Sequence, residues 1–193
     1  TEEIWGEVDR HQKDHLSCNY SENLRRQMSL GWHNLISSGL INGTHEELMD
    51  YVYQGLVDLV LHEVGHTLGL RHNYKGSSIY SIEQLSNPDF TKIYGISGSV
   101  MDYHPVSLLD NGNTMFQTFP GPYDDWAIEY GYSEFSSGDE KNNLEKIASQ
   151  SNHPILAYGT DEDTFGRSSR GIDPTCNVWD ISNDPIAYYE NQI

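Results

Sequence analysis

The sequence predicts one mainly helical, loop-rich domain of the α+β class that spans residues 1–193. Two long segments carry apolar residues at helical spacing, and a stretch rich in turn signals follows them. The length of 193 residues fits one domain with a sizeable core, and 13 Tyr, 5 Phe and 4 Trp favour a folded chain. Strand signals are limited to short pieces such as residues 92–97, which come after both long segments.

The first helix is expected over residues 21–38, where Gly39 ends it. Its apolar positions recur at helical spacing: Leu24, Met28, Trp32 and Leu35. The second helix is expected over residues 46–68, with Thr44 as the N-cap and Gly69 as the C-terminal stop. The buried face of this second helix is expected to consist of Val52, Leu56, Leu59 or Val60, Val64 and Leu68.

The rest of the chain carries weaker signals of regular structure. Turn signals predict loops over residues 71–118, and a short helix is expected between Asp124 and Gly131. A further helix is expected over residues 139–150. Beyond it we expect irregular chain, including an exposed loop at residues 165–174.

The charge balance excludes several classes of partner. A formal net charge of -18 argues against nucleic acid and anionic membranes, because both repel an acidic surface. No apolar run approaches the roughly 20 residues that span a bilayer, so no membrane span is expected. We interpret the acidity as a surface that keeps a secreted protein soluble. A cationic substrate, or calcium bound at acidic clusters such as residues 161–163, is the alternative.

The two cysteines, Cys18 and Cys176, are too far apart in the sequence to form a CxxC metal or redox motif. One interpretation, which we favour, is a single long-range disulfide formed in an oxidising compartment. The other is two buried free thiols. The sequence leaves both interpretations open.

The segment HEVGHTLGLRH, from His62 to His72, predicts a metal site. His62 and His66 lie four residues apart on one face of the expected helix, where two imidazoles can bind one Zn²⁺ ion. Glu63 can reach a water on the metal without being a ligand. Gly69 breaks the helix, so the chain can turn back and bring His72 to the metal as a third ligand. Three protein ligands leave one position open for water, which is typical of a catalytic zinc site.

These residues predict hydrolysis of a peptide bond without a covalent intermediate. A zinc ion lowers the pKa of a bound water to about 7. Glu63 then acts as the general base that takes the proton of this water, and it later returns a proton to the leaving amine.

The segment resembles the zinc-binding motif of the metzincin zinc metalloproteases, and other segments extend the resemblance. The sequence SVMDYHP (99–105) resembles the methionine turn of that family, which makes Met101 the structural methionine. Tyr103 matches a tyrosine that, in astacin-like and serralysin-like members, binds zinc and swings away to stabilise the oxyanion. For each residue alone, a place in the core is the alternative. The segment DDWAIEYGY (124–132) resembles the C-terminal helix of the family, whose role is packing.

The resemblance also implies a sheet that the sequence does not show. Metzincins usually have a mixed sheet before the zinc helix, and its edge strand pairs with the substrate. Only 61 residues precede His62, and they look helical. We expect that N-terminal sheet residues are missing from this chain; the alternative is a lineage that builds its cleft differently. Asn73 after His72 is a departure, because several subfamilies have Asp or Glu there.

A closer resemblance covers most of the chain, through segments such as LAYGTDED and DPIAYYE. They resemble bacterial secreted or periplasmic zinc-dependent metzincins, including the metalloprotease A subunit of EcxAB-type AB-pentamer enterotoxins. That resemblance implies protein or peptide substrates and a pentameric cell-binding B subunit as a partner. It also implies a protease-sensitive loop at residues 166–171, for which an ordinary exposed loop is the alternative.

The leading hypothesis is therefore a secreted zinc endopeptidase that forms the catalytic subunit of a bacterial toxin. One alternative is the catalytic domain of a larger periplasmic zinc metalloprotease. Another is a metal-binding interaction subunit with weak or no proteolysis, against which the intact Glu63 argues, because such a subunit needs no base. A zinc hydrolase that acts on a non-peptide amide is the last.

Overall fold

The computed structural model describes residues 18–109, 113–136, 138–165 and 173–190, and these residues form helices, turns and loops. The α-helices are α2 (Tyr20–Ser37), α3 (His45–Thr67), α4 (Ile82–Leu85), α5 (Pro88–Tyr94), α6 (Pro122–Tyr132), α7 (Glu140–Ala148), α8 (Asp161–Thr164) and α9 (Pro185–Glu190). Short 3-10 helices are Ser77–Ile79, Ser149–Asn152 and Pro154–Leu156. The part of the chain that is described contains no strand, so the β part of the expected class is not seen in it.

The expected strand signal at residues 92–97 is wrong, because half of it belongs to α5. Asn87 caps this helix by accepting a hydrogen bond from the backbone N–H of Asp89, and Pro88 occupies the first turn. Gly95, with a φ of 71°, then ends it. The cap at Asn87, Pro88 and Gly95 therefore produce a short helix where the apolar run alone would favour a strand.

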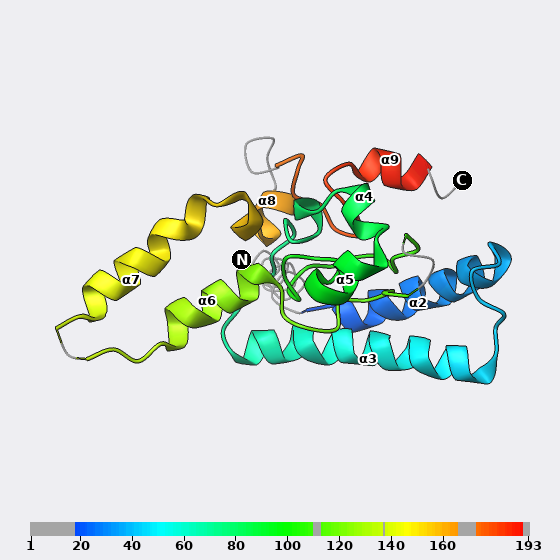
Figure 1. Cartoon of the computed structure of the whole chain (residues 1–193), viewed down its shortest axis with the longest axis horizontal. Coiled ribbons are helices and arrows are strands. Elements are labelled where there is room, and N and C mark those ends of the chain that lie inside the picture. The colour runs from blue at the N-terminus through cyan, green and yellow to red at the C-terminus, as the bar shows by residue number, and fades with distance from the viewer. Residues whose placement is uncertain (1–17, 110–112, 137, 166–172, 191–193) are drawn as a thin grey trace, which may run out of the picture.

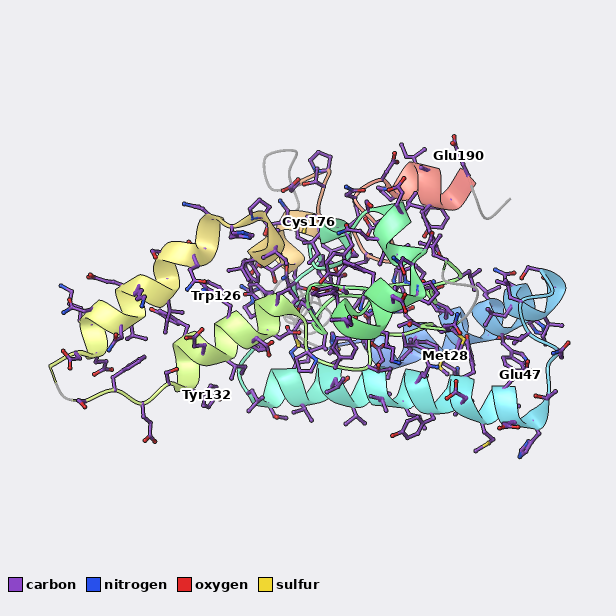
Figure 2. The ribbon with its side chains drawn as sticks, viewed as in Figure 1. Met28, Glu47, Trp126, Tyr132, Cys176 and Glu190 are labelled. Carbon is purple, nitrogen blue, oxygen red and sulfur yellow. The ribbon has the colours of Figure 1, made fainter. Side chains whose placement is uncertain are left out.

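The long helices α2 and α3 lie side by side along one edge of the molecule (Figure 1). Both agree with the sequence prediction to within one residue at each end. Thr44 caps α3 as expected, and Glu47 completes a capping box with it. The two helices approach closely where Met28 packs on Gly55, since a Cβ at Gly55 would overlap the Met28 side chain (Figure 2).

The predicted buried face of α3 is right only in part: Val52 and Leu59 are half-buried and pack against the core. Its buried residues are Tyr51, Gly55, Asp58, His62 and Gly65. The apolar residues Leu56, Val60, Val64 and Leu68 are instead 41% to 58% exposed. On the inward side of the helix, the ring of His62 contacts other rings: its centroid lies 4.4 Å from that of Tyr20, 4.8 Å from that of His66 and 5.4 Å from that of His72.

A largely aromatic core lies between α2, α3 and the loops that follow them. It contains Tyr20, Leu24, Leu35, Tyr51, Tyr74, Tyr103, Val106, Met115, Phe116 and Cys176. A second cluster joins α4 and α9 to the loops: Tyr80, Leu85, Ile96, Ile181 and Tyr188. No helix in the described ranges is long and apolar enough to cross a membrane.

The helices α6 and α7 form an arm at one end of the molecule (Figure 1). Trp126 joins them, because its indole N–H donates a hydrogen bond to the carbonyl of Ile147 at 2.9 Å (Figure 2). At the end of α6, the hydroxyl of Tyr132 donates to the carbonyl of Leu68 beside the metal-site turn. Both predicted helices are thus confirmed. The expected loop at residues 166–171 lies outside the described residues.

Candidate metal centre

The structure brings the three predicted histidine ligands together. His62 and His66 lie one turn apart on α3, and the chain then turns at Gly69 and returns with His72. The turn is a Schellman motif: Gly69, with a φ of 86°, donates to the carbonyl of His66, and Leu70 donates to that of Gly65. The Nε2 atoms of His66 and His72 are 3.2 Å apart as a result.

Each of these imidazoles is oriented by a different acceptor at its Nδ1 atom. His62 donates from Nδ1 to the carbonyl of Val100 at 2.8 Å, and His66 donates to the carbonyl of Leu70 at 3.0 Å. A carbonyl can only accept, so Nδ1 carries the proton in both rings and Nε2 carries a free lone pair. Burial, helped by the neighbouring histidines, lowers the pKa of His62 to about 3, which keeps the ring neutral.

This arrangement fits a zinc ion. Two nitrogens that each lie about 2.05 Å from one tetrahedral zinc are separated by about 3.3 Å. The observed separation of 3.2 Å between the Nε2 atoms of His66 and His72 agrees with that value. A contact this short needs a proton or a metal ion between the two nitrogens, because two bare lone pairs would repel. The donor set therefore has the chemistry and the spacing of a zinc site.

The third histidine, His72, is oriented by a carboxylate that the sequence did not identify. Its Nδ1 lies 2.9 Å from Oδ1 of Asp161, and the hydroxyl of Tyr74 donates to the same oxygen at 3.0 Å. Burial alone would raise the pKa of Asp161, but the hydrogen bond and charge of His72 outweigh it and lower this pKa to about 2. Asp161 thus remains ionised and holds the ring of His72, which would strengthen this histidine as a metal ligand.

The acidic run at residues 161–163, which was a candidate for calcium, is engaged by protein groups. Besides Asp161, Glu162 accepts two hydrogen bonds from Arg71 at 2.6 and 2.8 Å. Asp163 accepts from the backbone N–H of Thr160 at 2.9 Å and caps α8. Each carboxylate of the run therefore has a protein partner, and one of them serves the histidine cluster.

Met101 lies directly beneath α3, where the resemblance predicts the methionine. Its side chain is fully buried, and a Cβ built on Gly65 would overlap its sulfur atom. The glycine inside the HEVGH segment is therefore required by the close approach of the methionine. Sequence reasoning did not give Gly65 this role.

The loop that carries Met101 is held in place by Asp124 of α6. The hydroxyl of Ser99 donates to Oδ1 of Asp124 at 2.6 Å, and the N–H groups of Val100 and Gly121 donate to Oδ2 at 2.8 Å. Because the carbonyl of Val100 in turn orients His62, the carboxylate of Asp124 is linked to this candidate ligand through one residue. Besides packing, α6 therefore supplies a buried carboxylate that holds the loop of Met101 by hydrogen bonds.

The predicted catalytic residues lie beside the cluster. The hydroxyl of Tyr103 is 3.1 Å from Nε2 of His72, and Glu63 is exposed on the same turn of α3 as His62. Burial raises the pKa of Tyr103 well above its usual range, so its phenol keeps its proton and can donate a hydrogen bond. Their catalytic roles remain predictions.

The predicted disulfide is wrong for this structure, because Cys18 and Cys176 are both free. The Sγ atom of Cys176 faces the hydroxyl of Thr164 at 3.1 Å. Cys18 faces the histidines instead: its Sγ atom lies 3.4 Å from Nε2 of His62. With the three histidines, Cys18 makes a group whose possible ligand atoms all lie within 4.8 Å of one another. No spacing rule linked Cys18 to the motif.

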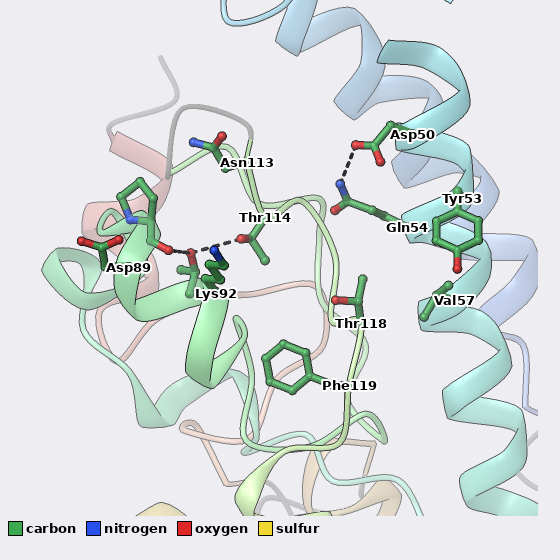
Figure 3. Close-up of a pocket in the computed structure, with 12 residues that line it drawn as sticks. Asp50, Tyr53, Gln54, Val57, Asp89, Lys92, Asn113, Thr114, Thr118 and Phe119 are labelled. Carbon is green, nitrogen blue, oxygen red and sulfur yellow. Dashed lines mark hydrogen bonds between the residues drawn. The ribbon is translucent and has the colours of Figure 1, made fainter. Parts of the chain in front are cut away.

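A separate pocket of about 530 Å³ lies between α3 and α5 (Figure 3). Asp50, Tyr53 and Gln54 line it from α3, with Lys92 and Phe119 on the opposite side. The residues that line it include no member of the histidine cluster, so the pocket and the candidate metal centre are different features of the surface.

Comparison with known proteins decides the family. A family model described as Met-zincin matches residues 44–193, a range that contains the three histidines, Met101 and Tyr103. The chain belongs to the Met-zincin family. Met-zincins are zinc metalloproteases, so membership implies a metal, usually zinc, and protein substrates. It confirms the metzincin resemblance, and the mainly helical structure is compatible with a metzincin-like fold. No curated protein and no solved structure matches the chain.

Proposed function

We propose that this Met-zincin is a zinc-dependent endopeptidase in which Glu63 is the general base. The observation that carries the proposal is the convergence of three imidazole rings, with Nε2 of His66 and Nε2 of His72 3.2 Å apart and Glu63 on the adjoining position of the same helix. Such a set of three nitrogen ligands leaves a position for a reacting group, as catalytic zinc sites do.

Each side chain of the site has a separate role in the proposed reaction. A bound zinc ion supplies a Lewis acid for the scissile carbonyl and an acidified water. Glu63 accepts the proton of the attacking water and delivers it to the leaving amine. Tyr103, whose hydroxyl lies 3.1 Å from Nε2 of His72, donates a hydrogen bond to the negative charge that develops on the carbonyl oxygen. Asp161 and Asp124 are positioning residues: Asp161 holds His72, and Asp124 holds Val100, whose carbonyl orients His62.

The test compares cleavage of denatured casein by the wild-type chain and by Glu63→Gln, with zinc content measured in each. We expect Glu63→Gln to keep its zinc and lose cleavage. Glu46→Gln, on the first turn of the same helix, is the matched control and should cleave like the wild type. Cleavage by Glu63→Gln near the wild-type rate would refute the role of Glu63, and a wild type without zinc would refute the site.

We also propose that the chain works outside the cytoplasm of a bacterium, as a secreted or periplasmic enzyme with a pentameric cell-binding subunit as its partner. The support is the resemblance in segments such as HEVGHTLGLRHNYKGSS (62–78). The catalytic domain of a larger periplasmic metalloprotease is the alternative. Immunoblots of medium and periplasm from the producing bacterium separate the two, because the second requires a larger polypeptide that stays in the periplasm.

A further inference from the structure

We propose that Trp179 is a positioning residue that fixes Tyr103 beside the histidine cluster. Trp179 belongs to the segment that leads into α9, far along the chain from the zinc-binding motif. In this role it acts through Tyr103 and not on the substrate. The proposal rests on the proposed function, because it takes the catalytic role of Tyr103 from it.

Both polar groups of the Tyr103 backbone are held. Its N–H donates to the buried carboxylate of Asp102 at 2.6 Å, and its carbonyl accepts from the N–H of Trp179 at 2.6 Å. Asp102 also accepts from the N–H of Ser77 at 2.7 Å. The hydroxyl of Ser77 in turn donates to Asp180 at 3.2 Å. A ring of hydrogen bonds therefore joins the residue before Tyr103 to the residue after Trp179.

The side chain of Tyr103 is packed against two other rings. Tyr20 stacks on it with centroids 4.8 Å apart, and the ring of Trp179 lies 5.5 Å from it. Trp179 is also 5.9 Å from Tyr20, so the three rings form one cluster. Tyr103 is only 4% exposed. A ring packed in this way has little freedom to rotate, which keeps its hydroxyl 3.1 Å from Nε2 of His72.

The backbone of Trp179 indicates that its place is imposed by its surroundings. Its φ is 63°, in the left-handed region that residues with a side chain rarely adopt. Such a conformation persists only where neighbouring contacts determine it. The N–H of Trp179 is engaged by Tyr103, and its carbonyl accepts from the hydroxyl of Tyr189 in α9. The helix α9 therefore holds Trp179 in the position from which it contacts Tyr103.

The position of Tyr103 matters for the rate more than for substrate binding. Its hydroxyl acts on negative charge that develops only in the transition state. A displacement on the order of 1 Å in an active site can lower the rate about 10²-fold. Loosening Tyr103 should therefore lower kcat and leave KM nearly unchanged.

The experiment is a double-mutant cycle between Trp179 and Tyr103, with kcat and KM measured on labelled casein. Trp179→Gly removes the ring and accepts the left-handed backbone, so it should lower kcat roughly tenfold and change KM less than about twofold. In a Tyr103→Phe background the same substitution should change kcat less than about twofold, because the hydroxyl that it positions is absent. Trp179→Phe keeps an aromatic ring and should recover most of the wild-type kcat.

A second pair of variants changes one hydroxyl only. Tyr189→Phe removes the hydrogen bond to the carbonyl of Trp179 and should lower kcat in the same direction by a smaller factor. Tyr130→Phe, at an exposed position of α6, is the matched control and should leave kcat unchanged. If circular dichroism shows that Trp179→Gly is unfolded, this pair decides: equal kcat values for Tyr189→Phe and Tyr130→Phe would overturn the proposal.

A readout that needs neither metal nor activity is the flip rate of the Tyr103 ring. It is measured by NMR on the metal-free full chain with ring-labelled tyrosine, and Tyr103→Phe assigns the signal. Trp179→Gly should raise this rate roughly tenfold or more, because the ring loses a packing partner. An unchanged rate in the folded variant would overturn Trp179 as the residue that holds Tyr103.

The outcomes separate this proposal from the proposed function. An equal loss of kcat from Trp179→Gly with and without the Tyr103 hydroxyl shows that Trp179 does not act through Tyr103, and it leaves the proposed function intact. A wild-type kcat in Tyr103→Phe refutes the oxyanion role of Tyr103 in the proposed function and removes the catalytic part of this proposal with it. The ring-flip rate then still shows whether Trp179 holds the ring.

Discussion

Replacing Asp161 by alanine should weaken zinc binding without unfolding the chain. The carboxylate accepts from Nδ1 of His72 at 2.9 Å, and its removal leaves the hydroxyl of Tyr74, 2.8 Å from the same nitrogen, as the substitute acceptor. A hydrogen bond to a charged group contributes about 1.5–3 kcal/mol and one to a neutral group about 0.5–1.5 kcal/mol. The expected loss is therefore about 1–2 kcal/mol, or roughly 5- to 30-fold in zinc affinity.

Competition with a chromophoric chelator at fixed pH measures that affinity. Asp161→Asn keeps an oxygen acceptor and should lose less affinity than Asp161→Ala. Glu162→Gln is the matched control, because Glu162 pairs with Arg71 and contacts no ligand. If Asp161→Ala binds zinc as tightly as Glu162→Gln does, Asp161 does not support His72 and the reasoning fails.

Three further predictions concern the fold and the reaction. Gly65→Ala should lower the free energy of unfolding by about 1–3 kcal/mol, because the added methyl group collides with Met101. Gly131→Ala is the control and should lower it by nothing, because a Cβ there meets no atom. Equal losses in thermal unfolding would contradict the packing argument. Burial raises the pKa of Asp58 from 3.8 to about 7, so the folded chain keeps a proton that the unfolded chain loses. The stability of the metal-free chain should therefore fall as pH rises from about 4 to 7, by up to about 1.4 kcal/mol per pH unit, and Asp58→Asn should flatten that slope in urea unfolding; an unchanged slope would refute it. Tyr103→Phe should bind zinc normally and lower kcat about 10²- to 10³-fold, and a kcat like that of the wild type would exclude the oxyanion role.

The sequence predicted the features that depend on residues close together in the chain. The start of α3 at Thr44 and its end at Gly69 follow from a capping box and a left-handed glycine, which are local. The placement of His62 and His66 follows from the pitch of a helix in the same way. The short helices α4, α5, α8 and α9 were missed, because such elements depend on caps and packing more than on periodicity.

The features that the sequence could not predict are contacts between distant segments. Asp161 lies 89 residues from His72, and Cys18 lies 44 residues from His62, so no spacing rule connects either pair. The buried face of α3 was right only at Val52 and Leu59, for a related reason. Apolar periodicity selects the side that carries Leu56 and Val60, whereas the interior is built around the histidines and Asp58.

The convergence of imidazole nitrogens at 3.2 Å links metal loading to folding. Folding brings Nε2 of His66 and Nε2 of His72 within 3.2 Å of each other, and the hydrogen bonds to Leu70 and Asp161 hold the two rings there. A metal ion binds this arrangement only in the native state, since the unfolded chain does not assemble the ligands. A free zinc concentration a hundredfold above its dissociation constant then adds about 2.7 kcal/mol to stability. Metal supply is therefore expected to raise the stability of the chain as well as its activity.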